Sequence, residues 1–197
     1  QYQIKQKSFS TFEEFFDAVS KEIKPVRLFT QGDLEQIRGI IHLSEDLHER
    51  DIGHRIVQSA KSSLAQCTAP INIAVESQNT LSSGGELILW SIHSISGEVD
   101  MTNPVRLSGD ALLDQRKSAQ DVGKEAAEEL LNEINSKSAA DSFLADQLIL
   151  YMSMLPASII KTSKITNHTT TNLYVAEQFL EVTFSIDENV IKVEKKQ

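Results

Sequence analysis

Short segments with the apolar period of a β-strand alternate with longer segments that have the period of a helix, and this alternation is the strongest constraint on the fold. Strand patterns occur at 2–9, 26–29, 36–43, 71–76, 86–92, from 159, at 182–186 and at 191–193. Helix patterns occur at 11–24, 50–66, 119–135, 140–155 and 168–180. Strands interleaved with helices predict an α/β or α+β architecture, in which sheets pack in layers against helices.

Local signals support several of these helices. Ser10 is typical of a helix N-cap, Glu13 would close a capping box with it, and Pro25 would end that helix. The apolar residues of 140–155 nearly encircle the helix, so we expect it to be largely buried.

Two kinds of break divide the chain. The stretch 94–117 contains Gly97, Pro104 and Gly109 and few periodic apolar residues, which predicts a long loop. Composition changes near 25–35 and again near 136–140, where small polar residues separate two helices. These breaks predict a central inserted domain, with both ends of the chain belonging to another unit.

The composition excludes several classes of protein. The 197 residues are 40% hydrophobic and 24% charged, as in ordinary globular proteins. Cys67 is the single cysteine, which rules out an internal disulfide framework and a cysteine-built zinc site. No apolar run approaches the roughly 18 residues that a membrane helix needs, and the start lacks a signal-peptide pattern. We therefore expect an intracellular protein without a membrane partner.

Motifs alone identify no activity. The five histidines do not have zinc-ligand spacing, and neither a P-loop nor a GxSxG sequence is present. The net charge of −9 is not that of a general nucleic-acid binder. His168 is notable because it lies at a predicted helix start, where free N–H groups and a partial positive charge favour a neutral imidazole and bind phosphate. A histidine near a helix cap without a function is the alternative.

Four segments together resemble a known family. They are VGKEAAEELL (122–131), FLADQLILYM (143–152), NHTTTNLYVAEQFL (167–180) and ELILWS (86–91). In order and spacing they are similar to the carboxyl-terminal half of RNA 3′-terminal phosphate cyclases, over residues 36–186. The LADQL and HTTTN sequences are the most specific parts of the resemblance.

The resemblance implies a reaction and a set of site residues. In that family a histidine attacks the α-phosphate of ATP, the AMP passes to an RNA 3′-phosphate, and the adjacent 2′-hydroxyl displaces it to give a 2′,3′-cyclic phosphate. A divalent cation, Mg²⁺ or Mn²⁺, assists. His168 falls on the position of the nucleophile, Asp146 and Gln147 fall on a pair that lines the nucleotide site, and Phe143 could pack on the adenine. No protein ligand of the metal can be assigned.

The resemblance also implies a domain arrangement and a partner. Residues 1–29 would begin the last sheet-plus-two-helix repeat of an outer domain, 30–137 would form a smaller inserted α/β domain, and 138–197 would return to the outer domain. The substrate would be RNA with a 3′-phosphate end, contacted locally, in the cytoplasm or in a eukaryotic nucleus. The family's amino-terminal motif, its RNA-binding arginines and its metal carboxylate have no match here, so we expect a longer parent protein.

Two other functions stay open. One is a non-catalytic, cyclase-like scaffold for ribosome assembly, which binds RNA. Such relatives typically lack the nucleophilic histidine, so His168 argues against it. The other is an incomplete domain that binds ATP or RNA weakly.

Overall fold

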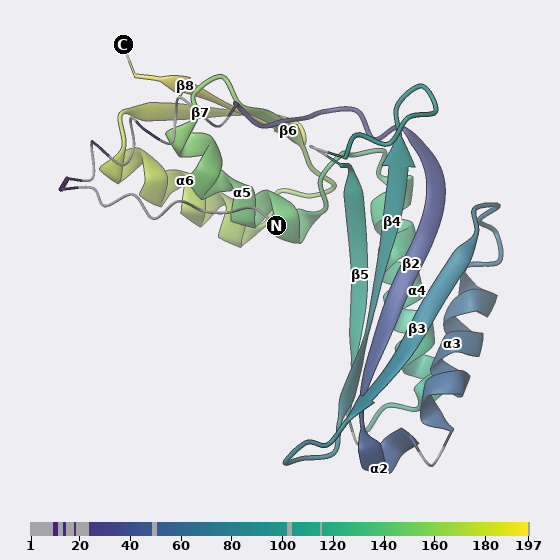
Figure 1. Ribbon diagram of the computed structural model, residues 1–197. Coiled ribbons are helices and arrows are strands. Elements are labelled where there is room, and N and C mark those ends of the chain that lie inside the picture. Colours follow the sequence, from purple (N-terminus) through teal and green to yellow (C-terminus); the bar gives the residue numbers. More distant parts are fainter. Residues whose placement is uncertain are drawn as a thin grey trace. The chain divides into compact units, whose positions relative to one another are not determined.

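The computed structural model describes residues 24–48, 51–101, 104–114 and 116–196, together with 10, 11, 14 and 18 (Figure 1). The strand expected at 2–9 and most of the helix expected at 11–24, including Glu13, lie outside the described residues. The chain divides into two compact units. The first contains residues 1–27, 143–160 and 165–197, and the second contains residues 28–142 and 161–164.

The second unit is built on a four-stranded sheet with the order β3-β2-β4-β5. Its strands are β2 (Asp33–Ser44), β3 (Ile71–Gln78), β4 (Gly85–Ser94) and β5 (Arg106–Leu113). The β2 strand pairs in parallel with β3 and antiparallel with β4, which pairs antiparallel with β5. The short helix α2 (Glu45–His48) and α3 (Ile52–Ser63) connect the parallel strands, as such a crossover requires.

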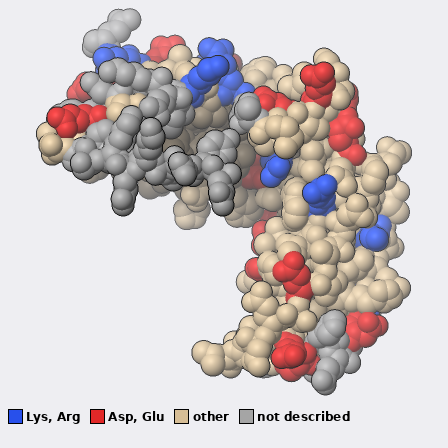
Figure 2. Space-filling model, in the orientation of Figure 1, with Lys and Arg blue, Asp and Glu red and all other residues tan. Residues whose placement is uncertain are grey.

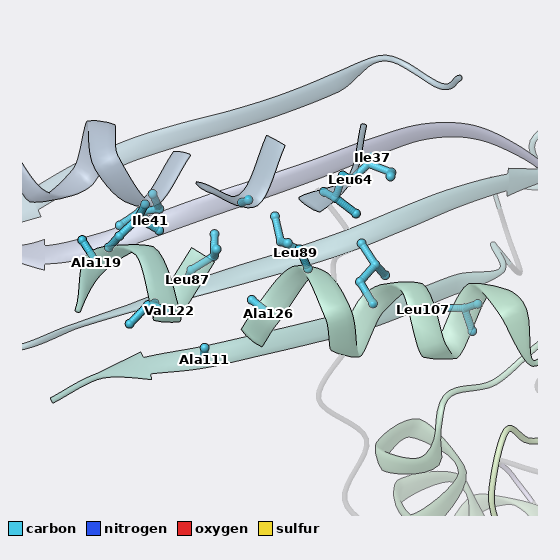
Figure 3. Packing of buried hydrophobic residues seen from close by; sticks show 14 of the residues in the cluster. Ile37, Ile41, Leu64, Leu87, Leu89, Leu107, Ala111, Ala119, Val122 and Ala126 are labelled. Atoms are coloured by element: carbon cyan, nitrogen blue, oxygen red, sulfur yellow. The ribbon is translucent and has the colours of Figure 1, made fainter. Parts of the chain in front are cut away.

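One face of this sheet is covered by α3 and by α4 (Ala119–Asn135). The hydrophobic core lies between this face and the two helices (Figure 3). Alternate strand residues point into the core, as the period of two predicts. They pack against the apolar stripes of the two helices. The fully buried core side chains include Ile37, Ile41, Ile56, Leu64, Leu87, Leu89, Leu107, Val122 and Leu130.

The prediction that 94–117 forms a long loop is wrong, because β5 occupies its centre. The inward-facing residues of β5 are Leu107, Gly109 and Ala111. Two of the three are small, which hides the strand period in the sequence. A Cβ on Gly109 would lie 2.4 Å from the backbone nitrogen of Leu130 and 2.5 Å from the carbonyl oxygen of Ala126. The close approach of α4 to the sheet therefore requires glycine at position 109, and this glycine is one reason that the sequence pattern did not predict β5.

Side chains satisfy polar groups at two borders of the second unit. On the outer edge of β5, the N–H of Ser108 donates to the Asp141 carboxylate at 2.9 Å and the N–H of Asp110 donates to the Glu129 carboxylate at 2.8 Å. Near the start of the unit, the buried Gln31 amide donates to the carbonyl oxygen of Ile134 at 3.0 Å. This bond joins the segment that enters the unit to the end of α4.

The other sheet has the order β1-β6-β8-β7. Its strands are β1 (Arg27–Leu28), β6 (Ile159–Lys161), β7 (Val182–Asp187) and β8 (Val190–Lys195). Two helices, α5 (Ser142–Met154) and α6 (Asn167–Phe179), belong to the same region of the chain. Sheets combined with helices confirm the predicted mixed α/β fold class.

The prediction that the helix at 140–155 is largely buried is wrong. Only Ala145, Ile149, Met152 and Ser153 of α5 are buried. Phe143, Leu150 and Tyr151 are exposed by 55 to 59%. Although apolar residues occur on all sides of α5, only one side of the helix packs against other described parts of the protein. Among the described helices, none is long and apolar enough to cross a membrane.

Candidate functional site

The first turn of α6 is held by a capping box. Thr166 is the N-cap, and its hydroxyl accepts from the N–H of Thr169 at 3.0 Å. The Thr169 hydroxyl accepts from the N–H of Thr166 at 3.1 Å. His168 is the second residue of the helix, and its side chain is exposed. No acidic residue of α6 lies in this turn, so the helix itself supplies no negative charge there.

The negative charge comes from α5 instead. The Thr166 hydroxyl donates to the Asp146 carboxylate, with oxygen separations of 3.0 and 3.1 Å, and the Thr169 hydroxyl donates to the same carboxylate. Each threonine hydroxyl thus accepts a hydrogen bond from one backbone N–H and donates a hydrogen bond to the Asp146 carboxylate. The Asn172 amide donates to the backbone oxygen of Asp146 at 3.3 Å. Asp146 therefore positions the first turn of α6, and with it His168.

A groove of about 670 Å³ runs between α5 and α6. Asp146, Gln147 and Asn172 supply its polar groups, and the remainder is mainly apolar. The other lining residues are Ile149, Leu150, Tyr151, Met154, Val175, Ala176, Phe179 and Leu180. The groove can take a ligand with a flat apolar part and a polar part near Asp146.

The structure brings the predicted site residues together only in part. Asp146 and Gln147 line the groove, whereas His168 and Phe143 do not. Asp146 is half-buried, and the side chains of His168, Gln147 and Phe143 are exposed. The link between His168 and the groove is the capping network, because Thr169 follows His168 in the chain and donates to Asp146. The assigned roles of these four residues stay predictions.

Sequence reasoning missed the two threonines of the box. Thr166 is a typical N-cap residue, but the box usually has Glu or Gln three residues later, where this chain has Thr169, so the sequence signal was partial. The contact of these threonines with Asp146 had no such signal, because 20 residues separate Asp146 from Thr166.

The remaining ionisable groups do not form a second centre of this kind. His42 lies between two carboxylates, with Nδ1 at 3.1 Å from Glu86 and Nε2 at 3.9 Å from Glu76. Burial lowers the pKa of His93, which donates to or accepts from the Ser91 hydroxyl at 2.9 Å. Within the part of the chain that the structure describes, no group of three or more His, Cys, Asp or Glu is placed to hold a metal ion.

The fold and the site define a mixed α/β protein with an exposed histidine in the first turn of a capped helix. Residues 29–135 match the family described as "RNA 3′-terminal phosphate cyclase (RTC), insert domain". The chain therefore belongs to the RNA 3′-terminal phosphate cyclase family, as the four sequence segments predicted.

Curated relatives extend the similarity beyond the matched domain. An RNA 3′-terminal phosphate cyclase of Thermococcus onnurineus is 35% identical over 171 residues, which are 86% of this chain and 47% of that protein. One of Pyrococcus abyssi is 32% identical over 172 residues, covering 87% and 47%. One of Pyrobaculum aerophilum is 34% identical over 167 residues, covering 84% and 45%. The chain thus spans slightly less than half the length of these relatives.

Proposed function

We propose that this protein takes part in the ATP-dependent conversion of an RNA 3′-terminal phosphate to a 2′,3′-cyclic phosphate, with His168 as the nucleophile. The observation that carries the proposal is the position of His168, in a family of this name, on the first turn of α6 with its side chain exposed. An imidazole there can reach a phosphate that the helix N-terminus attracts.

The reaction has three displacements at phosphorus. A neutral ring nitrogen of His168 attacks the α-phosphorus of ATP, a P–N bond forms, and pyrophosphate leaves. An oxygen of the RNA 3′-phosphate then attacks the same phosphorus, which breaks the P–N bond and returns histidine. Finally the 2′-hydroxyl attacks the activated 3′-phosphorus, losing its proton, and AMP leaves. Positioning and charge stabilisation supply most of the rate enhancement in such transfers.

The other site residues are assigned to binding. Asp146 holds the first turn of α6 and borders the groove, Gln147 lines the groove, and Phe143 is an exposed ring one helical turn before them on α5. We assign the nucleotide to this region. Mg²⁺ or Mn²⁺ would accompany the ATP phosphates, but the described residues do not form a cation site by themselves, so no step is assigned to it.

We also assign residues 30–137 to the inserted domain, and residues 1–29 and 138–197 to the outer domain that would carry His168. The match of residues 29–135 to an insert domain supports the first assignment.

The test is covalent labelling by ATP that carries the label in its α-phosphate, with Mg²⁺ or Mn²⁺. Because the chain spans less than half of its relatives, the assay uses both this chain and a chimera in which it replaces the matched segment of the Thermococcus onnurineus cyclase. We expect an acid-labile label on the peptide containing His168 in the chimera, and complete loss of it in the His168→Ala variant of that chimera.

The matched control is His54→Ala, which removes another exposed histidine, located in α3. Its labelling should equal that of the parent chimera. Label that persists in a folded His168→Ala variant would reject His168 as the nucleophile. A folded chimera without label would favour the non-catalytic scaffold.

A further inference from the structure

The face of the second unit's sheet that α3 and α4 do not cover has an ordered pattern of side chains. Cross-strand register places the residues in rows. Arg38 of β2, Trp90 of β4 and Ser108 of β5 form one row, and Ile92 of β4 lies opposite Arg106 of β5 in the next. On the other side of Trp90, Ile40 lies opposite Ile88. These residues alternate with the buried ones, so they point away from the core.

The pattern separates charge along the strands. Ile92 and Arg106 form the first row, and Arg38, Trp90 and Ser108 form the second. Ile40, Ile88 and Asp110 form the third row, and Glu76, His42 and Glu86 form the fourth. The arginines therefore lie in the first two rows and the carboxylates in the last two. In Figure 2 the strands face the viewer, and both blue and red patches are scattered over a largely uncharged surface. An indole beside guanidinium groups is a surface suited to flat rings that carry phosphates.

The charged groups at the two ends differ in their partners. Glu76 and Glu86 both lie within 4 Å of the His42 ring, at 3.9 and 3.1 Å. Arg38 and Arg106 are exposed, and no carboxylate among the described residues forms an ion pair with either. The Nε of Arg38 donates to the Gln36 side chain at 3.0 Å, which leaves its terminal N–H groups for a ligand. The two arginines of this face are therefore available to an anion, whereas Glu76 and Glu86 share His42, and Asp110 lies one row beyond Trp90.

We propose that this open sheet face binds single-stranded RNA, with a base stacked on Trp90 and phosphates at Arg38 and Arg106. Strand spacings of about 4.8 Å and a rise of about 3.4 Å per residue put the two arginine backbones about 12 Å apart, with Trp90 between them. A base on the ring would thus have a cation on each side. The proposal rests on the proposed function only for the choice of RNA as the ligand, and it needs neither ATP nor His168.

A second copy of this chain is the competing occupant, because a face with a basic end and an acidic end can pair with itself. A stable complex buries roughly 800 Å² on each partner, so pairing of two copies would have to use nearly the whole face of these four strands. Stacking on an aromatic platform needs much less area. The observations therefore favour the nucleic acid.

The test uses the fluorescence of Trp90, which is the single tryptophan of the chain. The probe is an oligouridine of about ten nucleotides with a 3′-hydroxyl end, added without ATP. We expect quenching that saturates and weakens as salt rises. Arg38→Ala and Arg106→Ala should each weaken binding several-fold and lower the slope of log K against log salt by about one.

Three variants separate binding from folding. Trp90→Ala, followed by the anisotropy of a labelled oligouridine, should lose about tenfold to a hundredfold in affinity. Trp90→Phe keeps a stacking ring and should stay within a few-fold of the parent. Arg55→Ala removes an equally exposed arginine from α3, on the covered side, and should bind as the parent does.

Unchanged Trp90 fluorescence on addition of the oligouridine would overturn the proposal, and so would equal losses in Arg38→Ala and Arg55→Ala. Sedimentation that shows a dimer broken by Trp90→Ala, without RNA binding, would assign the face to a second copy. Failure of His168 labelling with RNA binding intact would reject only the proposed reaction.

Discussion

The helices α4 and α6 both begin with a capping box, but their carboxylates come from different places. In α4, Ser118 pairs with Asp121, so the negative charge belongs to the first turn of the helix itself. In α6, Thr166 pairs with Thr169, and Asp146 of α5 supplies the charge through both hydroxyls. The capping box of α4 is thus complete within its own first turn. The start of α6 depends on its neighbour and presents His168 on a turn with no acidic residue of its own.

The difference matters for an anion. A carboxylate in the first turn occupies the positive potential of a helix N-terminus. Moving the carboxylate to α5 keeps the cap satisfied while the outward side of the first turn stays open. The site proposed for a phosphorylated ligand would gain from this arrangement, which the first turn of α4 does not have.

The largest expected effect follows from Asp146→Ala. It leaves two partly buried hydroxyls without their charged acceptor, which should lower the free energy of unfolding of the first unit by about 2 to 3 kcal/mol. Urea unfolding measures the loss, and hydrogen exchange should localise it to the N–H groups of Thr169 and Thr170. Gln147→Ala, the exposed neighbour, should change stability by less than about 0.5 kcal/mol. Equal losses in both variants would refute the dependence of α6 on Asp146.

A smaller effect is expected at α4. Ser118→Ala removes the N-cap hydroxyl and should cost about 1 kcal/mol of stability, seen as faster hydrogen exchange at Asp121 and Val122. The ATP labelling proposed for His168 should not change, because Ser118 belongs to the other unit. Ser62→Ala, on exposed α3 surface, is the matched control and should cost nothing measurable. Exchange that also accelerates in α6 would contradict the self-sufficiency of α4.

The smallest effect concerns the two ends of α4. Hydrogen bonds from the side chain and the N–H of Ser118 lower the pKa of Asp121, whereas burial raises the pKa of Glu133. The folded protein therefore holds the Glu133 proton more tightly than the unfolded chain. The resulting stabilisation is present below about pH 4.5 and is lost as pH rises through the raised pKa.

Glu133→Gln should remove this dependence, so the variant's stability should fall less than the parent's as pH rises. Denaturant midpoints measured at several values between about pH 4 and pH 8 check it. Glu128→Gln, an exposed residue of the same helix, should keep the parent's slope. Parallel curves for the parent and Glu133→Gln would reject the assignment.

Sequence patterns predicted the helices and the longer strands because these elements bury one regular face. The helix that carries His168 was expected at 168–180 and is observed at Asn167–Phe179. The β5 strand was not predicted because its inward position 109 is a glycine, which the close packing of α4 requires, and a glycine does not contribute to the apolar period of a strand. The burial of α5 was overestimated because apolar character does not show which neighbours a helix has.

For the site, the sequence pattern predicted His168 at a helix start, and the resemblance supplied its proposed role. The contact of Asp146 with Thr166 and Thr169 depends on how α5 and α6 pack. That packing is decided by many side chains together, and no local pattern records it.

The bond between Gln31 and Ile134 has a consequence for how such a chain could arise and be altered. It holds the two ends of the main segment of the second unit together, so that the polypeptide enters and leaves this segment at neighbouring points. A segment with adjacent ends can be added to a host protein, or exchanged for a short linker, without stretching the host backbone. Neighbouring ends of this kind would let the sheet of the second unit change its surface independently of the helix that carries His168.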